Sequence, residues 1–167
     1  DTGPILLQKK VDIEPDDTLG SIYFNKLFPM GVDAMLESID LVRDGNAPRV
    51  KQNPQDGTYE GWCRKADVEI DWSRPVAEVH NPIRGASPQP GAWTTRDGAV
   101  LKIFECARKP EAGGAPGEVV EVSGEGCTVA AGGGTIAVGR VQPGGEKKIA
   151  AGEYAAAAGV SKGDRLG

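Results

Sequence analysis

The chain has 167 residues, and its 19 basic and 24 acidic residues give a formal charge of −5. This length allows one large domain or two small ones, and the negative charge argues against indiscriminate binding to nucleic acids. The 24 glycines and 12 prolines follow no collagen-like period, and 39% of the residues are hydrophobic, which indicates loop-rich β structure rather than disorder. Because there is no run of about 18 apolar residues, we expect no transmembrane helix and no membrane partner.

Cysteine and histidine are sparse and scattered. The cysteines are Cys63, Cys106 and Cys127, with no C-x-x-C pair, and His80 is the only histidine. A zinc site needs about four nitrogen or sulfur ligands at local spacings, so we predict no metal site. Unpaired thiols favour a reducing compartment, and we therefore expect a cytoplasmic protein. We interpret His80 as a surface or helix-packing residue rather than the base of a self-contained catalytic triad.

The first 45 residues show the pattern of a strand followed by a helix. The apolar run at residues 5–7 predicts a buried strand. Apolar residues then recur at helical spacing over residues 19–42, after a helix start at residues 15–18, where a short side-chain oxygen can accept a free backbone N–H, and before Gly45, which suits a helix end. Pro29 is expected to kink or divide this helix, because proline lacks the N–H group and crowds the preceding turn. This pattern is typical of the end of an α/β domain.

A polar stretch separates this segment from a second helix. Residues 46–57 contain several proline, asparagine and glycine turn signals and are predicted to form a linker. A helix is predicted from Ser73 to Gly85, with Pro82 inside it. Its apolar face carries Val76, Val79 and Ile83.

The hydrophobic period changes after Gly91. Glycine-containing turns separate short β-prone runs, and a late helix is predicted around residues 153–158. Several short strands with one preceding helix suggest a small barrel such as an OB-fold. The predicted strands are residues 99–104, 118–122, 127–130 and 135–138.

Short motifs in a fixed order cover nearly the whole chain, and no one of them is specific alone. They are Asp1-Thr2-Gly3-x-Ile5-Leu6, Ile70-Asp71-Trp72, Pro88-x-Pro90-Gly91-Ala92-Trp93, Val141-Gln142-Pro143 and Gly163-Asp164-Arg165-Leu166. As an ordered set they resemble the 10-formyltetrahydrofolate-dependent formyltransferase family. Its branches include methionyl-tRNA formyltransferases and the hydrolase domain of 10-formyltetrahydrofolate dehydrogenases.

The resemblance implies an α+β chain made of three parts. Residues 1–45 would be the last strand and helices of a Rossmann-like catalytic domain, residues 46–63 a linker, and residues 64–167 an OB-like β-barrel domain. In the family, a catalytic Asn and His pair and a folate loop precede the Asp-Thr-Gly turn. We therefore expect the chain to be the C-terminal portion of a longer enzyme, inactive alone, with 10-formyltetrahydrofolate bound mainly by the upstream region.

Asp1 matches the catalytic aspartate of the family. The resemblance implies that its carboxylate orients and charge-stabilises a histidine that lies upstream, as a buried carboxylate does beside other catalytic imidazoles. Asp-Thr-Gly is also the triplet of aspartic proteases, but their mechanism needs a second such triplet, and the chain has none. A third interpretation is that Asp1 only accepts hydrogen bonds in a tight turn.

Six further residues are candidates for substrate or nucleic-acid contacts. Tyr59 and Lys65 could line the approach of the acceptor, or be a packed tyrosine and a solvated lysine. Arg84 could contact substrate or bond carbonyls near the proline-rich turn before Gly91. The candidate nucleic-acid contacts are Arg96, Lys147 and Lys148.

The distribution of charge does not identify the molecule that accepts the formyl group. The residues from Gly85 onward hold nine basic and nine acidic side chains, which is a weak footprint for a tRNA-binding domain. We favour formylation of an amino group, most simply that of initiator methionyl-tRNA, by a monomeric enzyme. Hydrolysis of 10-formyltetrahydrofolate, formylation of a sugar nucleotide and a purely binding role are the alternatives.

Overall fold

The computed structural model describes residues 2–167 and divides the chain into two compact units, residues 1–62 and 63–167. Each unit is described by itself. The domain boundaries drawn from the sequence, at residues 45 and 63, stay predictions.

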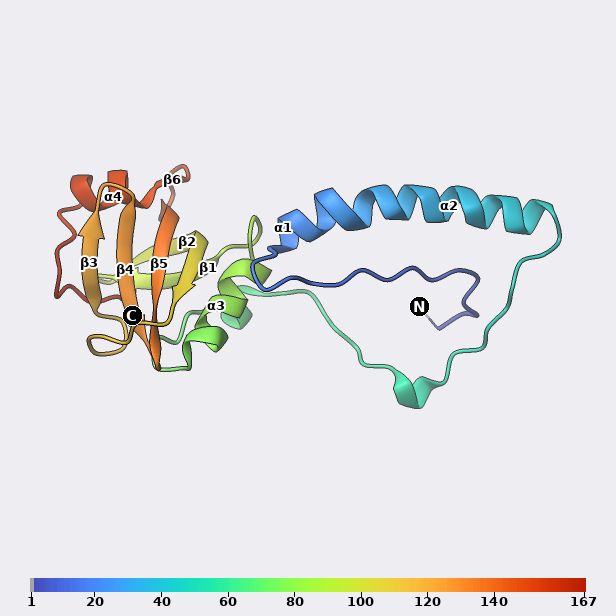
Figure 1. Ribbon diagram of the computed structural model, residues 1–167, viewed down its shortest axis with the longest axis horizontal. Helices are drawn as coiled ribbons and strands as arrows, with labels where there is room; N and C mark the ends of the chain where they lie inside the picture. The colour runs from blue at the N-terminus through green and yellow to red at the C-terminus, as the bar shows by residue number, and fades with distance from the viewer. Residues whose placement is uncertain (1) are drawn as a thin grey trace. The chain divides into compact units, whose positions relative to one another are not determined.

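The first unit is built on one long helix (Figure 1). Thr18 caps its first turn, since the Thr18 hydroxyl accepts a hydrogen bond from the Ser21 N–H at 3.0 Å and the Ser21 hydroxyl accepts one from the Thr18 N–H at 2.9 Å. This reciprocal pair satisfies donors that the helix itself leaves free. The helix consists of three consecutive parts, α1 (Leu19–Ile22), the π-helical η1 (Tyr23–Leu27) and α2 (Phe28–Arg43).

The predicted division of the helix at Pro29 is wrong, because the chain accommodates the proline without leaving the helix. Pro29 lies in the first turn of α2, directly after the π-helical residues, and the helix continues through it. The Phe28 N–H bonds the Tyr23 carbonyl, five residues earlier instead of four. A π turn is wider than an α turn, which makes room for the pyrrolidine ring and tolerates the missing donor.

The predicted end of this helix at Gly45 is confirmed. Gly45 has a φ of 71°, a left-handed conformation that glycine adopts without steric cost. The Asn46 N–H bonds the Leu41 carbonyl at 2.9 Å, and the Gly45 N–H bonds the Val42 carbonyl at 3.2 Å. These two bonds form the Schellman motif and satisfy carbonyls at the end of the helix.

The prediction of a buried strand at residues 5–7 is wrong. Ile5 makes a single antiparallel bridge with Val50, and residues 5–7 are only half-buried. An apolar run becomes a strand only where neighbouring strands supply a ladder, and the described residues of this unit supply one bridge. The polar stretch is mostly exposed and has no regular structure apart from the bridge at Val50 and the short helix η2 (Pro54–Asp56), and its role as a linker stays a prediction.

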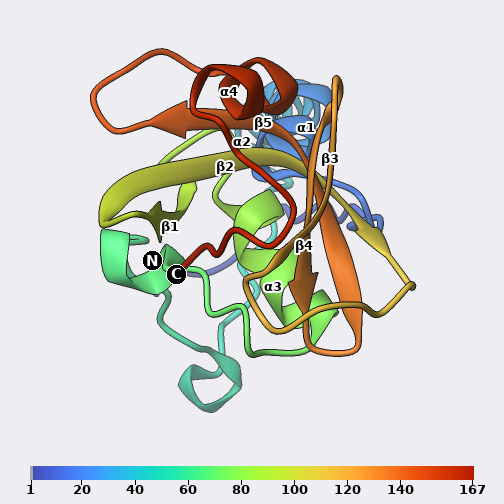
Figure 2. The ribbon, with the colours of Figure 1, turned by 90° about the vertical axis from the view of Figure 1, so that its left-hand side faces the viewer.

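The second unit combines two helices with an antiparallel sheet (Figure 2). The predicted helix before the sheet is confirmed, but it begins at Val76 rather than Ser73. Ser73 instead bonds Asp71 through its N–H at 3.0 Å, which forms a turn before the helix. The elements are η3 (Lys65–Val68), α3 (Val76–Gly85), β1 (Ala92–Arg96), β2 (Ala99–Lys109), β3 (Val119–Ser123), β4 (Gly126–Ala131), β5 (Gly134–Pro143), β6 (Ile149–Ala150) and α4 (Ala151–Ala157).

The strands pair in the order β1-β2-β5-β4-β3, and β6 pairs with β5. No ladder joins β1 to β3 among the described residues, so the sheet is open and the closed OB-like barrel predicted from the sequence is not formed. The C-terminal backbone crosses this gap instead. The Leu166 N–H bonds the Gly117 carbonyl at 2.8 Å, and the Gly167 N–H bonds the Thr95 carbonyl at 2.9 Å. In Figure 2 this red segment descends from α4 and ends beside β1.

The core of the second unit lies between the sheet and its helices. The helix α3 contributes Val79 and Ile83, which are 2% and 0% exposed, as the helical spacing predicted. Branched side chains of the strands meet them, and burying each such side chain contributes about 1.5–3 kcal/mol. The fully buried strand residues include Ile103, Val119, Val129, Ile136 and Val141.

Candidate functional site

The predicted catalytic residue, Asp1, lies outside the described residues, so its role stays a prediction. Within the described segment next to it, the Gly3 carbonyl accepts a hydrogen bond from Gln52 Nε2 at 2.7 Å.

The candidates for the acceptor approach differ in their surroundings. Tyr59 is 93% exposed. In the second unit, the ammonium group of Lys65 lies 4.5 Å from the centroid of the Trp93 ring, and Trp93 Nε1 donates a hydrogen bond to the Lys65 carbonyl at 2.7 Å. Lys65 therefore rests on an aromatic face, an arrangement that orients a cation without neutralising it. Arg84 Nε bonds Asn81 Oδ1 at 2.9 Å within α3. The substrate contacts proposed for these residues stay predictions.

Arg96 is held by the C-terminal part of the chain. Its guanidinium donates hydrogen bonds to the Ala158 carbonyl at 3.0 Å and to Asp164 Oδ2 at 2.9 Å, and its side chain is only 15% exposed. Desolvation lowers the pKa of Arg96, but the hydrogen bonds with Asp164 and Tyr154 outweigh it and raise the pKa overall. These contacts give Arg96 a structural role, and its contact with nucleic acid stays a prediction.

Lys147 and Lys148 have different environments although they are adjacent. Lys147 is exposed, whereas Lys148 is half-buried, with its ammonium nitrogen 3.6 Å from the centroid of the Phe104 ring. Lys148 Nζ also donates a hydrogen bond to the Pro88 carbonyl at 2.9 Å. Lys148, predicted from the sequence to contact nucleic acid, thus bonds a carbonyl of the proline-rich turn.

Sequence reasoning missed a second lysine beside Lys148. Lys102, on β2, donates a hydrogen bond from Nζ to the Pro90 carbonyl at 2.8 Å. Strand alternation could have found it, since Lys102 and Phe104 are two residues apart on one strand and such residues share a face. The signal was overlooked because residues 99–104 are apolar apart from Lys102 and were interpreted only as a short β-prone run.

Together these residues form a group that we name the Phe104 cluster, defined as Lys102, Phe104, Glu105, Arg140 and Lys148. Arg140 Nε bonds Glu105 Oε1 at 2.7 Å. Partial burial lowers the pKa of Lys148, and the nearby charges of Lys102 and Arg140 lower it further. The cluster holds three cations and one carboxylate, so it has an excess of positive charge. Its cations come from β2, from β5 and from the residue that precedes β6.

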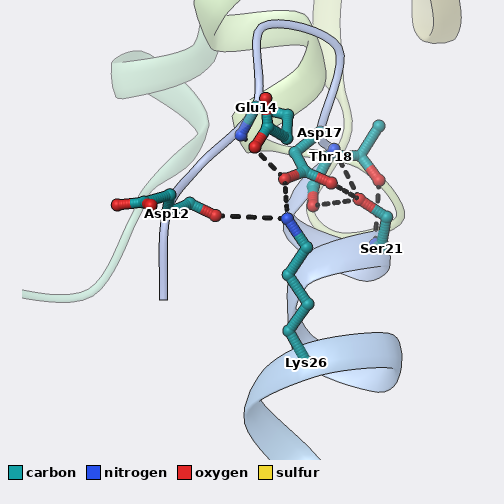
Figure 3. Close-up of polar contacts among 6 residues, drawn as sticks. All are labelled: Asp12, Glu14, Asp17, Thr18, Ser21 and Lys26. Atoms are coloured by element: carbon teal, nitrogen blue, oxygen red, sulfur yellow. Dashed lines mark hydrogen bonds and ion pairs between the residues drawn. The ribbon is translucent and has the colours of Figure 1, made fainter. Parts of the chain in front are cut away.

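A separate polar network lies at the start of the long helix in the first unit (Figure 3). Lys26 Nζ bonds Asp17 Oδ2 at 2.6 Å and the Asp12 carbonyl at 3.1 Å, while Ser21 Oγ bonds Asp17 Oδ1 at 2.8 Å. The hydrogen bond with Lys26 is the largest cause of the low pKa of Asp17, about 2, and the bonds with Glu14 and Ser21 lower it further. This network fixes the helix start, because an anion is favoured where helix N–H groups are unpaired.

A shallow groove of about 680 Å³ runs over β2, β5, β4 and the turn between β3 and β4. Its lining includes the small residues Ala107 and Ala137 and the charged residues Glu105, Glu121, Glu125 and Lys109. Glu105 is paired with Arg140 and Glu121 with Lys109, while Glu125 adds a further negative charge, so this groove is unfavourable for a phosphate backbone.

In the part of the chain that the structure describes, no three His, Cys, Asp or Glu side chains come close enough together to hold a metal ion. No helix among residues 2–167 has both the length and the apolar character needed to cross a bilayer.

Comparison with known proteins gives a match to a family model and relatives that are similar over most of this chain. The family model described as "Formyl transferase, C-terminal domain" matches residues 63–159. The methionyl-tRNA formyltransferase of Symbiobacterium thermophilum is 40% identical over 169 residues, covering 99% of this chain and 52% of that protein. The mitochondrial 10-formyltetrahydrofolate dehydrogenase of Homo sapiens is 42% identical over 124 residues, covering 74% of this chain and 13% of that protein. The chain thus spans about half, or much less, of the length of these relatives.

Solved structures share the fold at low sequence identity. A variant of HypX from Aquifex aeolicus superposes with a TM-score of 0.81 at 17% identity, over 98% of this chain and 29% of that one. The N-formyltransferase from Helicobacter canadensis, in complex with folinic acid and dTDP-3-aminofucose, has a TM-score of 0.60 at 22% identity, over 85% of this chain and 51% of that one. The family match covers more than half of the chain, and the chain therefore belongs to the formyltransferase family through its C-terminal domain.

Proposed function

We propose that this chain is the C-terminal part of an enzyme that transfers the formyl group of 10-formyltetrahydrofolate to the amino group of methionyl-tRNA. The observation that carries the proposal is the extent of the match to methionyl-tRNA formyltransferase, which runs through both units and covers 99% of the chain. The match to the human dehydrogenase covers 74%.

The reaction defines what the residues have to do. The acceptor nitrogen must lose a proton as it attacks the formyl carbon, the carbonyl oxygen gains negative charge, and the folate nitrogen leaves. In our proposal Asp1 is a catalytic residue that orients a histidine of the catalytic domain and stabilises its protonated form, as implied by the family motif. We place the folate site mainly in the part of the catalytic domain that full-length relatives have in addition to the region matched here.

The second unit would contribute to acceptor binding. The exposed Lys147 and the cations of the Phe104 cluster offer charge for phosphate groups, although the region from Gly85 onward has no net charge. Lys65, in the second unit, is a proposed acceptor contact, and Tyr59, in the first unit, is a separate proposed contact that could stack on a base. Arg84 is proposed as a weaker candidate because it is engaged within α3.

A second candidate function is hydrolysis of 10-formyltetrahydrofolate, with water as the acceptor. The 42% identity to the human dehydrogenase favours it. Water needs no phosphate contacts, so under this alternative the cations of the second unit would have no role in turnover.

The proposal is tested with the full-length protein, 10-formyltetrahydrofolate and methionyl-tRNA, by measuring formyl-methionine formation. Asp1→Asn keeps the side-chain shape but removes the charge, and we expect turnover to fall at least about 100-fold, by analogy with the loss of the orienting carboxylate in other catalytic sites. The matched control is Asp33→Asn on the exposed part of α2, which should change turnover less than twofold. A loss of less than threefold for Asp1→Asn contradicts the catalytic role.

A further inference from the structure

We propose that Lys102, Arg140 and Lys148 form a phosphate-binding site on the second unit, and that its occupant is a phosphodiester group of an RNA acceptor. This inference rests on the proposed function and deepens it by assigning the acceptor contact to particular side chains. Of these three residues, the sequence pointed only to Lys148.

The two lysines are held in place before any ligand binds. Lys102 donates to the Pro90 carbonyl at 2.8 Å and Lys148 to the Pro88 carbonyl at 2.9 Å, so two carbonyls of one turn position two ammonium groups. The Phe104 ring, 3.6 Å from Lys148 Nζ, supports that nitrogen from one side. An ammonium group has three donors, and each of these bonds uses one of them. Side chains fixed in this way lose less conformational entropy on binding an anion.

The charges of the Phe104 cluster do not balance. It has three cations and one carboxylate, and that carboxylate, Glu105, bonds Arg140 at 2.7 Å. Neither Lys102 nor Lys148 has a carboxylate partner among the ion pairs of the described residues. Burial is the largest cause of the lowered pKa of Lys148, and repulsion by the charges of Lys102 and Arg140 lowers it further. A bound phosphate would relieve this repulsion.

Two other places in the second unit are less suitable for contact with a phosphate. In the groove over β2, β5 and β4, Lys109 is paired with Glu121 and the lining includes the further carboxylate of Glu125, which disfavours a phosphate backbone. Arg96 is engaged with Ala158 and Asp164. The Phe104 cluster, in contrast, brings three cations together with one carboxylate.

Glu105 competes with a phosphate for the guanidinium group of Arg140. It holds the Arg140 guanidinium, so Arg140 can contact a phosphate only in competition with Glu105. The side chain of Arg140 is 44% exposed and that of Glu105 is 62% exposed, so a phosphate can reach both. Removing the charge of Glu105 should release Arg140 and strengthen RNA binding. A purely structural ion pair predicts no such gain.

The test uses the 167-residue chain and a fluorescein-labelled RNA hairpin with a single-stranded CCA 3′ end, with binding followed by fluorescence anisotropy at several salt concentrations. Lys102→Gln and Lys148→Gln should each weaken binding about fivefold at low salt and reduce the slope of log Kd against log salt by about one. Glu105→Gln should strengthen binding about threefold and increase that slope. The matched controls are Lys162→Gln and Glu111→Gln, both at exposed positions.

Lys148→Arg keeps the charge and should retain most of the binding, which separates the loss of a cation from a disturbed turn. If the wild-type chain binds the hairpin and the cluster variants match their controls, this site is wrong and the proposed function stands. If the wild-type chain does not bind the hairpin, the RNA acceptor itself is contradicted, and with it the occupant proposed here. If inorganic phosphate at the same ionic strength displaces the hairpin as well as an unlabelled hairpin does, the site binds free phosphate rather than a phosphodiester, which also contradicts the proposal.

Discussion

Arg96 and Asp164 are 68 positions apart in the sequence, yet Nη2 of the arginine lies 2.9 Å from Oδ2 of the aspartate. The same guanidinium bonds the carbonyl of Ala158, next to the end of α4. Arg96 thus joins the end of β1 to the chain segment that crosses the open side of the sheet. This contact, together with the backbone bonds of Leu166 and Gly167, replaces the strand pairing that would close a barrel.

Removing this link should destabilise the second unit. We expect Arg96→Ala to lower the free energy of unfolding by about 2 kcal/mol, because hydrogen bonds to a charged group in a mostly buried setting are lost. Chemical denaturation followed by tryptophan fluorescence measures the effect. Arg108→Ala, at an exposed position of β2, should cost less than about 0.5 kcal/mol. Equal effects for the two variants would contradict the role given to Arg96.

The carboxyl group of Asp17 should titrate well below its ordinary pKa of 3.8, at about 2. A folded-state pKa below the unfolded value means that the charged carboxylate stabilises the helix start above pH 3.8. That contribution is lost as the pH falls toward 2. Carboxyl carbon NMR of the chain measures the midpoint. Lys26→Met should move it up toward 3.8, whereas Lys10→Met, at an exposed position, should leave it in place.

Gly91 should not tolerate a side chain. It has a φ of 83°, and an added Cβ would lie 2.6 Å from the Phe104 ring. Gly91→Ala should therefore cost well over 1 kcal/mol of stability and displace the ring against which Lys148 rests. Gly98→Ala is the control for backbone strain alone, since its φ is 78° and nothing lies within 4 Å of the added carbon. A Gly91 variant no less stable than the Gly98 variant would contradict the contact with Phe104.

The cysteines should differ in reactivity. Burial raises the pKa of the Cys127 thiol to about 11, so little thiolate forms near neutral pH. Cys63 is exposed. Mass spectrometry after brief treatment with iodoacetamide at pH 8 should find Cys63 modified and Cys127 unmodified. Modification of Cys127 at the same rate would mean that the sheet around it opens readily.

Local signals in the sequence predicted the helices well. The helix start predicted at residues 15–18 and the helix end predicted at Gly45 mark the two ends of the long helix, because capping residues act through backbone groups within one turn. The spacing of Val79 and Ile83 likewise predicted the buried face of α3. Such signals depend on neighbours close in the chain and need no knowledge of the fold.

Features that depend on distant partners were not predictable in the same way. The run at residues 5–7 has the composition of a strand but only one bridge to pair with. Strand β1, which carries Trp93, was not predicted from the sequence. Its pairing partner β2 became clear only in the structure. The Phe104 cluster brings together lysines 46 positions apart in the sequence, and only the pairing of β2 with β5 and of β5 with β6 shows that they meet.

The central claim is that the formyl group goes to an amine rather than to water. The most direct measurement supplies the full-length protein with 10-formyltetrahydrofolate labelled in the formyl carbon and with methionyl-tRNA, then divides the label between precipitated tRNA and free formate. We expect most of the label on the tRNA, and little release of formate when the tRNA is omitted. Formate as the main product, at a rate that the tRNA does not change, would contradict the account.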